Sequence, residues 1–239
     1  MYGQVALRDR IVRVKLVQRT LEFHVEGNSV IYRRVIDGNL EYECEVVSTE
    51  AMFIEPVAPI FTPKRLTHFI LVEFTNNVVL PPESSTSGYT RIPVDIAVFA
   101  VKGEEYKVID VFSENKVKYA LYGPKNEGVI ARYYKSRFSH EVEGLEYFKE
   151  VIVPLEVVNS HDKWVKLTQV LLDANMLNFY YEHSGKACTQ KAKVEITSDS
   201  TAIVEYSKED IEGMDKARKP LKLTLFMPSL RRTEMMWGI

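Results

Sequence analysis

The feature that most constrains the fold is a long run of alternating apolar and polar residues between His68 and Tyr122. Clusters of Pro, Gly and Ser interrupt the alternation, for example at Pro81-Pro82 and at Gly103. Side chains that alternate with a period of two lie on opposite faces of a β-strand, so that one face is buried and the other meets water. The run therefore predicts several half-buried antiparallel strands and a mainly β fold, while it indicates no chemistry.

The same alternation recurs before and after this run. Before it, Asp37-Gly38 separates the stretches 30–36 and 40–47, which is a strong signal for a hairpin. After it, further short strands are expected at 151–158, 176–181, 191–196, 202–206 and 221–227. The stretch 164–172 is too densely apolar for periodicity to decide whether it is a strand or a helix.

One short helix is predicted near the end of the chain. Ser207 is a suitable N-cap residue with acids following it, and Pro220 would end the helix. Between them, Ile211, Met214 and Ala217 have helical spacing. We expect one or two such helices in the whole chain.

A polar, irregular stretch at 136–147 interrupts the strand pattern and indicates a domain boundary near 138–146. We therefore expect two antiparallel β-sandwich-like domains, an N-terminal one over 1–140 and a C-terminal one over 145–239. The second has the short-strand rhythm of an immunoglobulin-like sandwich, but it lacks the Cys-Trp-Cys pattern of true immunoglobulin domains.

The sequence also gives expectations for the proline-rich segment 55–63 and for the acidic residue Asp95. Three prolines between Glu55 and Pro63 predict an extended surface connector, because proline cannot donate to a central strand. Asp95 lies among apolar residues, and we expect it on the outer face of its strand together with Pro93 and Ala97.

Composition narrows the classes of protein. The 239 residues carry a net charge of −2, which gives no overall attraction to nucleic acid or to an anionic membrane. The two cysteines, Cys44 and Cys188, are far apart and form no paired motif, which favours a reducing cytoplasm. We see neither a secretory signal nor a transmembrane segment, so a cytoplasmic location is expected.

Catalytic, metal-binding and cofactor patterns are not found in the sequence. The five histidines have no ligand-like spacing, and Ser160-His161-Asp162 is read as a polar turn, because triads are assembled from distant positions. We therefore predict no catalytic, metal or cofactor-binding residues and favour a non-enzymatic role.

Two segments are candidates for contact with partners. Aromatic and basic residues interleave in one of them, which would suit weak binding of single-stranded nucleic acid; its members are Arg132, Tyr133, Tyr134, Lys135 and Arg137. The other is the tail with Met235, Met236 and Trp237, which would either dock on its own domain or bind a partner.

Short motifs give the chain a resemblance to a family. They are Glu55-Pro56-Val57 with Pro59, Pro81 with Ser84, Pro93-Val94 with Ala97-Val98, Asp110-Val111-Phe112, and Lys118-Tyr119-Ala120-Leu121-Tyr122-Gly123. With the start Met1-Tyr2-Gly3, the chain resembles an uncharacterised archaeal family, domain of unknown function 432, over nearly its whole length. The resemblance implies an archaeal source and a cytoplasmic protein, and it brings no activity, cofactor or functional residues.

These observations favour a cytoplasmic binding or assembly module that acts through its edge strands and C-terminal tail. A protein partner or self-association into a homo-oligomer is expected. A carbohydrate-binding or carbohydrate-active β-sandwich is the first alternative, with Trp164 or tyrosines beside facing carboxylates; among Glu73, Glu83, Asp95 and Asp110 a pair could serve. Weak nucleic-acid binding is the second alternative.

Overall fold

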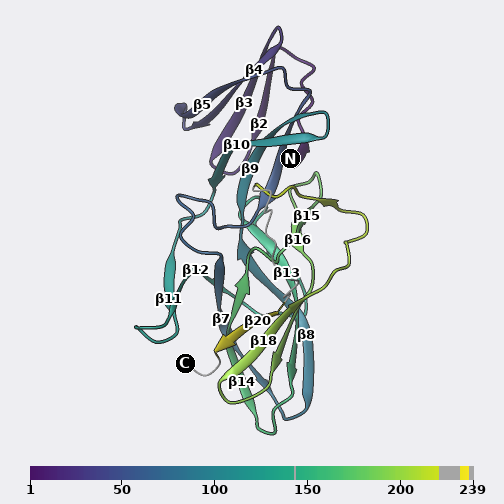
Figure 1. Cartoon of the computed structure of the whole chain (residues 1–239). Helices are drawn as coiled ribbons and strands as arrows, with labels where there is room; N and C mark the ends of the chain where they lie inside the picture. Colours follow the sequence, from purple (N-terminus) through teal and green to yellow (C-terminus); the bar gives the residue numbers. More distant parts are fainter. Residues whose placement is uncertain (143, 221–231, 237–239) are drawn as a thin grey trace.

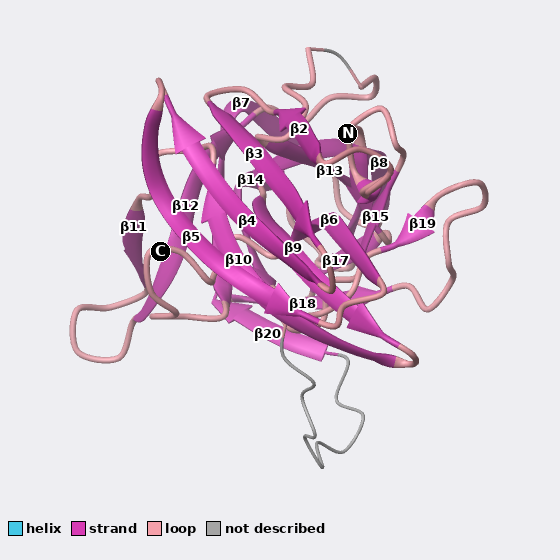
Figure 2. Ribbon diagram, turned by 90° about the horizontal axis from the view of Figure 1, so that it is seen from above, coloured by secondary structure: helices cyan, strands magenta, loops and turns pink. Residues whose placement is uncertain are grey.

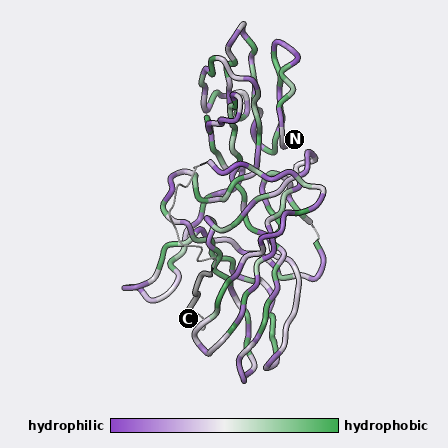
Figure 3. The backbone as a smooth tube through the Cα atoms, turned by 45° about the vertical axis from the view of Figure 1, so that its right-hand side comes forward, coloured by the Kyte–Doolittle hydropathy of each residue, from purple (hydrophilic) through white to green (hydrophobic). Residues whose placement is uncertain are grey.

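The alternating runs fold as β-strands that form four sheets, which confirms a mainly β protein (Figure 1). The computed structural model describes residues 1–142, 144–220 and 232–236. Along the chain, hydrophobic and hydrophilic residues alternate over short distances, as half-buried strands require (Figure 3). Within the described residues there is no helix, so neither a short helix nor one long and apolar enough to cross a bilayer is found there.

An antiparallel meander forms one end of the molecule. Its strands are β2 (Ile11–Lys15), β3 (Arg19–Glu26), β4 (Ser29–Ile36) and β5 (Asn39–Val47), side by side in this order (Figure 2). Leu21, Phe23 and Tyr32 are buried beneath the meander, whereas its other face is charged. Asp37 and Gly38 both have positive φ, as the tight turn of the predicted β4–β5 hairpin requires.

A second sheet contains the proline-rich segment that we expected to be a connector. Its order is β1 (Gly3–Gln4), β6 (Ala51–Val57), β9 (Asp95–Lys102) and β10 (Glu105–Ser113). The connector prediction was wrong for 55–57, because Pro56 lies in β6 opposite Ile96 of β9. On the side of β6 away from β9, the short strand β1 pairs with Phe53 and Ile54 and does not extend to Pro56, so a proline is tolerated there.

The other two sheets contribute buried residues to one shared hydrophobic core. One has the order β11 (Tyr119–Tyr122), β12 (Val129–Ser136), β7 (Phe69–Leu80) and β14 (Val165–Asp173). In it β12 runs parallel to β7, while β14 is antiparallel to β7. The ambiguous stretch 164–172 therefore lies almost entirely in a strand.

The largest sheet is built around β13 (Glu150–Asn159). This strand is antiparallel to β8 along its whole length and parallel to β16 and β17. The members of the sheet besides β13 are β8 (Ser84–Pro93), β15 (Phe179–Tyr181), β16 (Ala187–Thr189), β17 (Ala192–Ile196), β18 (Thr201–Tyr206), β19 (Asp215–Lys216) and β20 (Arg232–Met236).

Strand pairs cross the boundary that we expected near 138–146. β7 pairs with β14, β8 pairs with β13, and one hydrophobic core extends from Tyr2 to Tyr206. The division into domains at 1–140 and 145–239 stays a prediction, and these pairs join the two parts through hydrogen bonds.

The helix predicted after Ser207 is not formed. Gly213 has a φ of 77°, which right-handed helix does not allow, and the segment makes a turn at Ile211–Met214. Its end is instead bound to the sheets, because the Ala217 N–H donates to the carbonyl of Phe179. Local spacing suited a helix, but these contacts with distant strands prevail.

Asp95 is buried, so its predicted place on an outer face was wrong. The chain passes from β8 into β9 with only Val94 between them, and the first six residues of β9 are all buried. Side chains alternate between the two faces of a strand, but this alternation cannot identify an outer face when both faces are covered. The Asp95 carboxylate accepts hydrogen bonds from the Phe61 N–H, the Thr62 N–H and the Thr62 hydroxyl at 3.0–3.2 Å.

Candidate functional site

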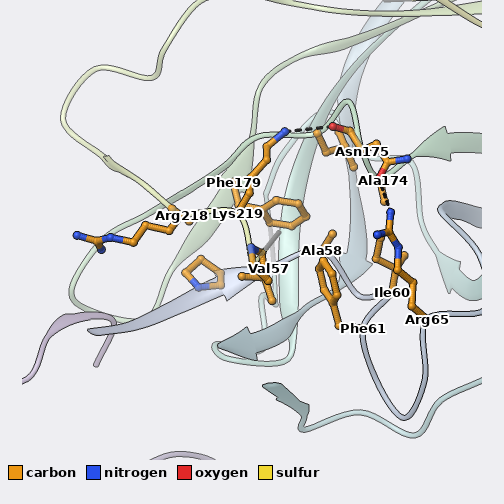
Figure 4. Close-up of a pocket in the computed structure, with 14 residues that line it drawn as sticks. Val57, Ala58, Ile60, Phe61, Arg65, Ala174, Asn175, Phe179, Arg218 and Lys219 are labelled. Atoms are coloured by element: carbon orange, nitrogen blue, oxygen red, sulfur yellow. Dashed lines mark hydrogen bonds between the residues drawn. The ribbon is translucent and has the colours of Figure 1, made fainter. Parts of the chain in front are cut away.

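A pocket lies where the end of β6 meets the loop after β14, and its free space is about 440 Å³ when the solvent at its open side is included (Figure 4). Its walls come from the stretches 56–61, 174–179 and 217–220, together with Arg65. Only about 30 Å³ of this space is enclosed, so the pocket is a shallow hollow, and a ligand longer than a few atoms would also lie along its open side. The topology thus brings segments separated by more than a hundred residues to one place.

The walls of the pocket are mostly apolar. Val57 and Ile60 are buried on one side, Leu177 and Phe179 are buried on the other, and the Phe61 ring lies beside them. The hydrogen bonds from the backbone of 61–62 to Asp95 fix the turn that carries Phe61. A buried carboxylate therefore holds one wall of the pocket in position.

Two cationic side chains converge on Asn175 at the edge of the pocket (Figure 4). Arg65 Nη2 donates to Asn175 Oδ1 at 3.0 Å, and Lys219 Nζ donates to the Asn175 carbonyl oxygen at 3.1 Å. Burial lowers the pKa of Lys219, and the nearby charge of Lys216 lowers it further. A bound anion would offset both effects, because it favours the protonated amine.

A third cation, Arg218, points away from the pocket and holds the 217–219 segment in place (Figure 4). Its guanidinium forms an ion pair with the fully buried Glu55 and lies 3.9 Å from the centre of the Phe53 ring. The Arg218 N–H also donates to Glu55 at 2.6 Å, and the Tyr181 hydroxyl donates to the same carboxylate. Burial raises the pKa of Glu55, and these contacts oppose that rise.

The balance of charge at the pocket is positive. None of the described lining residues is acidic, and the nearby carboxylates include that of Asp173 and that of Glu55, which is paired with Arg218. Asp173 Oδ1 accepts a hydrogen bond from the Asn175 N–H at 2.9 Å, which orients the loop. Arg65 and Lys219 thus combine with apolar walls, and this arrangement can bind a molecule with an apolar body and an anionic end.

The structure does not place the predicted basic-aromatic set on one surface. Arg132 is 1% exposed, and its positive charge acts to lower the pKa of the neighbouring Asp95. Tyr133 and Lys135 both contact Glu73, at 2.5 and 3.1 Å.

The other members of the set also have separate places. The Tyr134 hydroxyl donates to Glu150 at 2.7 Å, and Arg137 is exposed. Two cations of the set, Lys135 and Arg137, are therefore at the surface, and one acidic side chain, Glu73, accompanies Lys135.

The tail lies along the edge of the largest sheet. Met235 is opposite Ala202 and Met236 is opposite Thr201 in the β18–β20 pair, while Trp237 lies outside the described residues. The tail as a site for partners stays a prediction.

The residues considered for other chemistry lie apart. The Ser160 hydroxyl donates to Glu195, and the ring of His161 lies between Asp162 and Asp199, each at 2.8 Å, so the three neighbours form no triad. Trp164 is 68% exposed. In the part of the chain that the structure describes, no group of three or more His, Cys, Asp or Glu side chains could hold a metal ion.

Three of the four carboxylates named for carbohydrate chemistry are buried or bound by other side chains, and the carbohydrate alternative stays a prediction. Asp95 is buried, and Asp110 is bound by Arg34 and by the Tyr32 hydroxyl. Glu73 contacts Tyr133 and Lys135, as described above.

Sequence reasoning missed the pocket residues Arg65, Asn175 and Lys219. They belong to loops, and no spacing links them, because only the pairing of strands brings 65, 175 and 219 together. The three closely spaced prolines at 56–63 were the one local sign of an unusual backbone in this region.

With the geometry established, comparison with known proteins places the chain in a family. The profile of a family described as "Protein of unknown function (DUF432)" matches residues 1–236. The chain belongs to this family. No curated protein and no solved structure shows a significant match to it. For this DUF432 chain, the choice of ligand therefore rests on the chemistry of the pocket.

Proposed function

We propose that the protein is a non-enzymatic binding module whose pocket between residues 56–61 and 174–179 takes a small amphipathic acid. The apolar part of the ligand lies against Phe61 and Phe179, and its carboxylate lies between Arg65 and Lys219. The convergence of these two cations on Asn175, at the edge of an apolar pocket without an acidic lining residue, carries the proposal.

The proposed setting is the cytoplasm. It is supported by Cys44 and Cys188, which are free thiols as a reducing compartment favours. An archaeal source remains a prediction from the motifs.

Decanoate and decanol, titrated into the protein by calorimetry, test the proposal. Decanoate should bind more tightly than decanol, since only the carboxylate gains charge-assisted hydrogen bonds. Arg65→Met keeps an apolar stem and removes the charge, so it should weaken decanoate binding by about tenfold and leave decanol nearly unchanged.

A second variant tests the location of the ligand. Ala174 is 3% exposed in the pocket wall, so Ala174→Leu fills space that the ligand needs and should weaken both ligands. Arg8→Met, which removes a charge from an exposed arginine outside the pocket, is the matched control for Arg65→Met. Equal affinities for both ligands, or tight binding to Ala174→Leu, would contradict the proposal.

A further inference from the structure

The charged face of the β2–β5 meander carries a cross-strand ladder. In register across the four strands lie Arg13, Glu22, Arg33 and Glu43, so that positive and negative charges alternate from one edge to the other. Arg13 and Glu22 are 2.7 Å apart, and Arg33 forms an ion pair with Glu43. Opposite charges in such cross-strand pairs stabilise a sheet, whereas like charges destabilise it.

Both edges of this sheet are open within the described part of the chain. β2 and β5 are its end strands, and each pairs with a neighbour on one side only (Figure 2). The backbone on the other side of β2 and of β5 makes no backbone hydrogen bond to any described residue. Three large apolar side chains on these strands are exposed, Ile11 on β2 at 41% and Leu40 and Val47 on β5 at 56% and 65%.

The two edges complement each other in one antiparallel register. When Val47 of one copy lies opposite Ile11 of another, Glu45 meets Arg13 and Glu43 meets Lys15. On the inner face of the same register, the apolar pairs are Val46 with Val12 and Cys44 with Val14. All five pairs are therefore either apolar or of opposite charge, and the pleat of the sheet continues without a break.

Pairing of identical edges is electrostatically unfavourable. In a two-fold pair of β5 strands over residues 43–47, Glu45 would lie opposite its own copy, and a shift by two residues would place Glu43 opposite Glu45. In a two-fold pair of β2 strands, Arg13 would lie opposite its own copy. These like charges oppose a symmetric dimer through either edge.

We propose that a second copy of the chain binds through this edge complementarity, with β2 of one molecule adding to the β5 edge of the next. The contact is head-to-tail, so a pair of copies still has one free β2 edge at one end and one free β5 edge at the other. Such a heterologous contact extends into chains of copies, and a closed dimer is not its natural product. Glu45 and Lys15 make no ion pair among the described residues, and each would gain one in this assembly.

Sedimentation velocity over about a hundred-fold range of protein concentration tests the proposal. The sedimentation coefficient of the wild-type chain should rise with concentration, and less so in high salt, because the contact includes exposed ion pairs. Arg13→Glu and Glu45→Lys should each remain monomeric. A mixture of equal amounts of the two variants should associate again, because unlike variants present opposite charges to each other at positions 13 and 45 in both of their possible contacts.

Further variants separate assembly from folding. Arg13→Glu loses an ion pair with Glu22, whereas Lys15→Glu loses none and should also be monomeric. Lys166→Glu, the same change on an exposed lysine of β14 far from both edges, should assemble like the wild type. A wild-type chain that stays monomeric throughout, single variants that assemble like it, or a mixture of folded variants that stays monomeric would overturn the proposal.

Discussion

At the scale of single residues, Asp95 is the side chain on which one wall of the pocket depends. Its buried carboxylate binds the backbone of Phe61 and Thr62, and one of its oxygens, Oδ1, has no hydrogen-bond partner within the described protein. Both Nη atoms of the buried Arg132 also have no hydrogen-bond partner there. Buried polar groups of this kind are commonly satisfied by ordered water.

Asp95 makes stability depend on pH in a defined direction. Burial raises the pKa of Asp95 to about 6, while the charge of Arg132 opposes that rise. Between about pH 4 and pH 6 the native state binds this proton more tightly than the unfolded chain does, so the free energy of unfolding falls as pH rises. Over this window the wild type should lose up to about 3 kcal/mol through this group.

Asp95→Asn removes this titration and should flatten the profile measured by urea unfolding at several pH values. At pH 7 the variant should then be more stable than the wild type, since its amide pays no cost for a buried charge. Asp9→Asn, on an exposed aspartate, should leave the slope unchanged. An Asp95→Asn profile as steep as that of the wild type would contradict this role.

Glu55 is the second residue that supports the pocket, through Arg218. Glu55→Ala leaves the Arg218 guanidinium without its ion pair and should cost about 2–3 kcal/mol of stability, since Arg218 is partly exposed. Faster hydrogen exchange at the Ala217 amide would report release of the segment. Glu55→Gln, which keeps the shape of the side chain, is the matched variant and should cost less; equal exchange at Ala217 in all three proteins would refute the argument.

At the scale of elements, the 136–139 segment packs closely against the edge of β8 that is not paired with β13. The Tyr89 N–H donates to the Ser139 carbonyl oxygen at 2.7 Å, and the Arg91 N–H donates to Ser136 Oγ at 2.9 Å. A side chain at Gly88 would not fit, since its Cβ would lie 2.6 Å from that same Ser139 oxygen. The glycine is thus required by packing of backbone against backbone.

Gly88→Ala should therefore destabilise the protein by about 1–3 kcal/mol, which thermal unfolding measures. The obstacle is a backbone oxygen together with the Phe138 ring, so the segment has to move away from β8. Ser87→Ala, at the exposed neighbouring position, should change the melting temperature little. If both variants melt alike, the segment does not pack on β8 as described.

Elements that follow from local rules could be predicted from the sequence. The β4–β5 hairpin is an example, because the turn at Asp37-Gly38 is a property of those two residues. The segments at 55–57 and 207–219 were predicted wrongly, since Pro56 is tolerated by the short reach of β1 and the later segment is bound to distant strands. In both segments, contacts with residues far away in the sequence determine the backbone conformation.

The candidate site could not be predicted from local sequence patterns either, because its residues are far apart in the sequence. Arg65, Asn175 and Lys219 each lie in a loop without a recognisable motif, and their meeting depends on the order of strands in two sheets. Asp95 gave a visible signal as an acid among apolar residues, but its direction could not be read from a strand covered on both faces.

At the scale of the whole molecule, the sheets join the early and late parts of the chain. The pairs β7–β14 and β8–β13 span eight and ten residue pairs, and both cross residues 138–146. We therefore expect one cooperative unfolding transition, with far-ultraviolet circular dichroism and tryptophan fluorescence changing at the same urea concentration. Separate transitions, or a fragment of residues 1–140 that folds alone, would instead support two independent domains.

The central claim is that the pocket beside Asn175 binds the apolar body of an amphipathic acid. The most direct test is a set of intermolecular nuclear Overhauser effects between decanoate and the wild-type protein. The account predicts contacts from the methylene chain to the rings of Phe61 and Phe179, which lie in the pocket. Contacts to exposed aromatic residues elsewhere, such as Trp164, or no contacts at saturating decanoate, would contradict it.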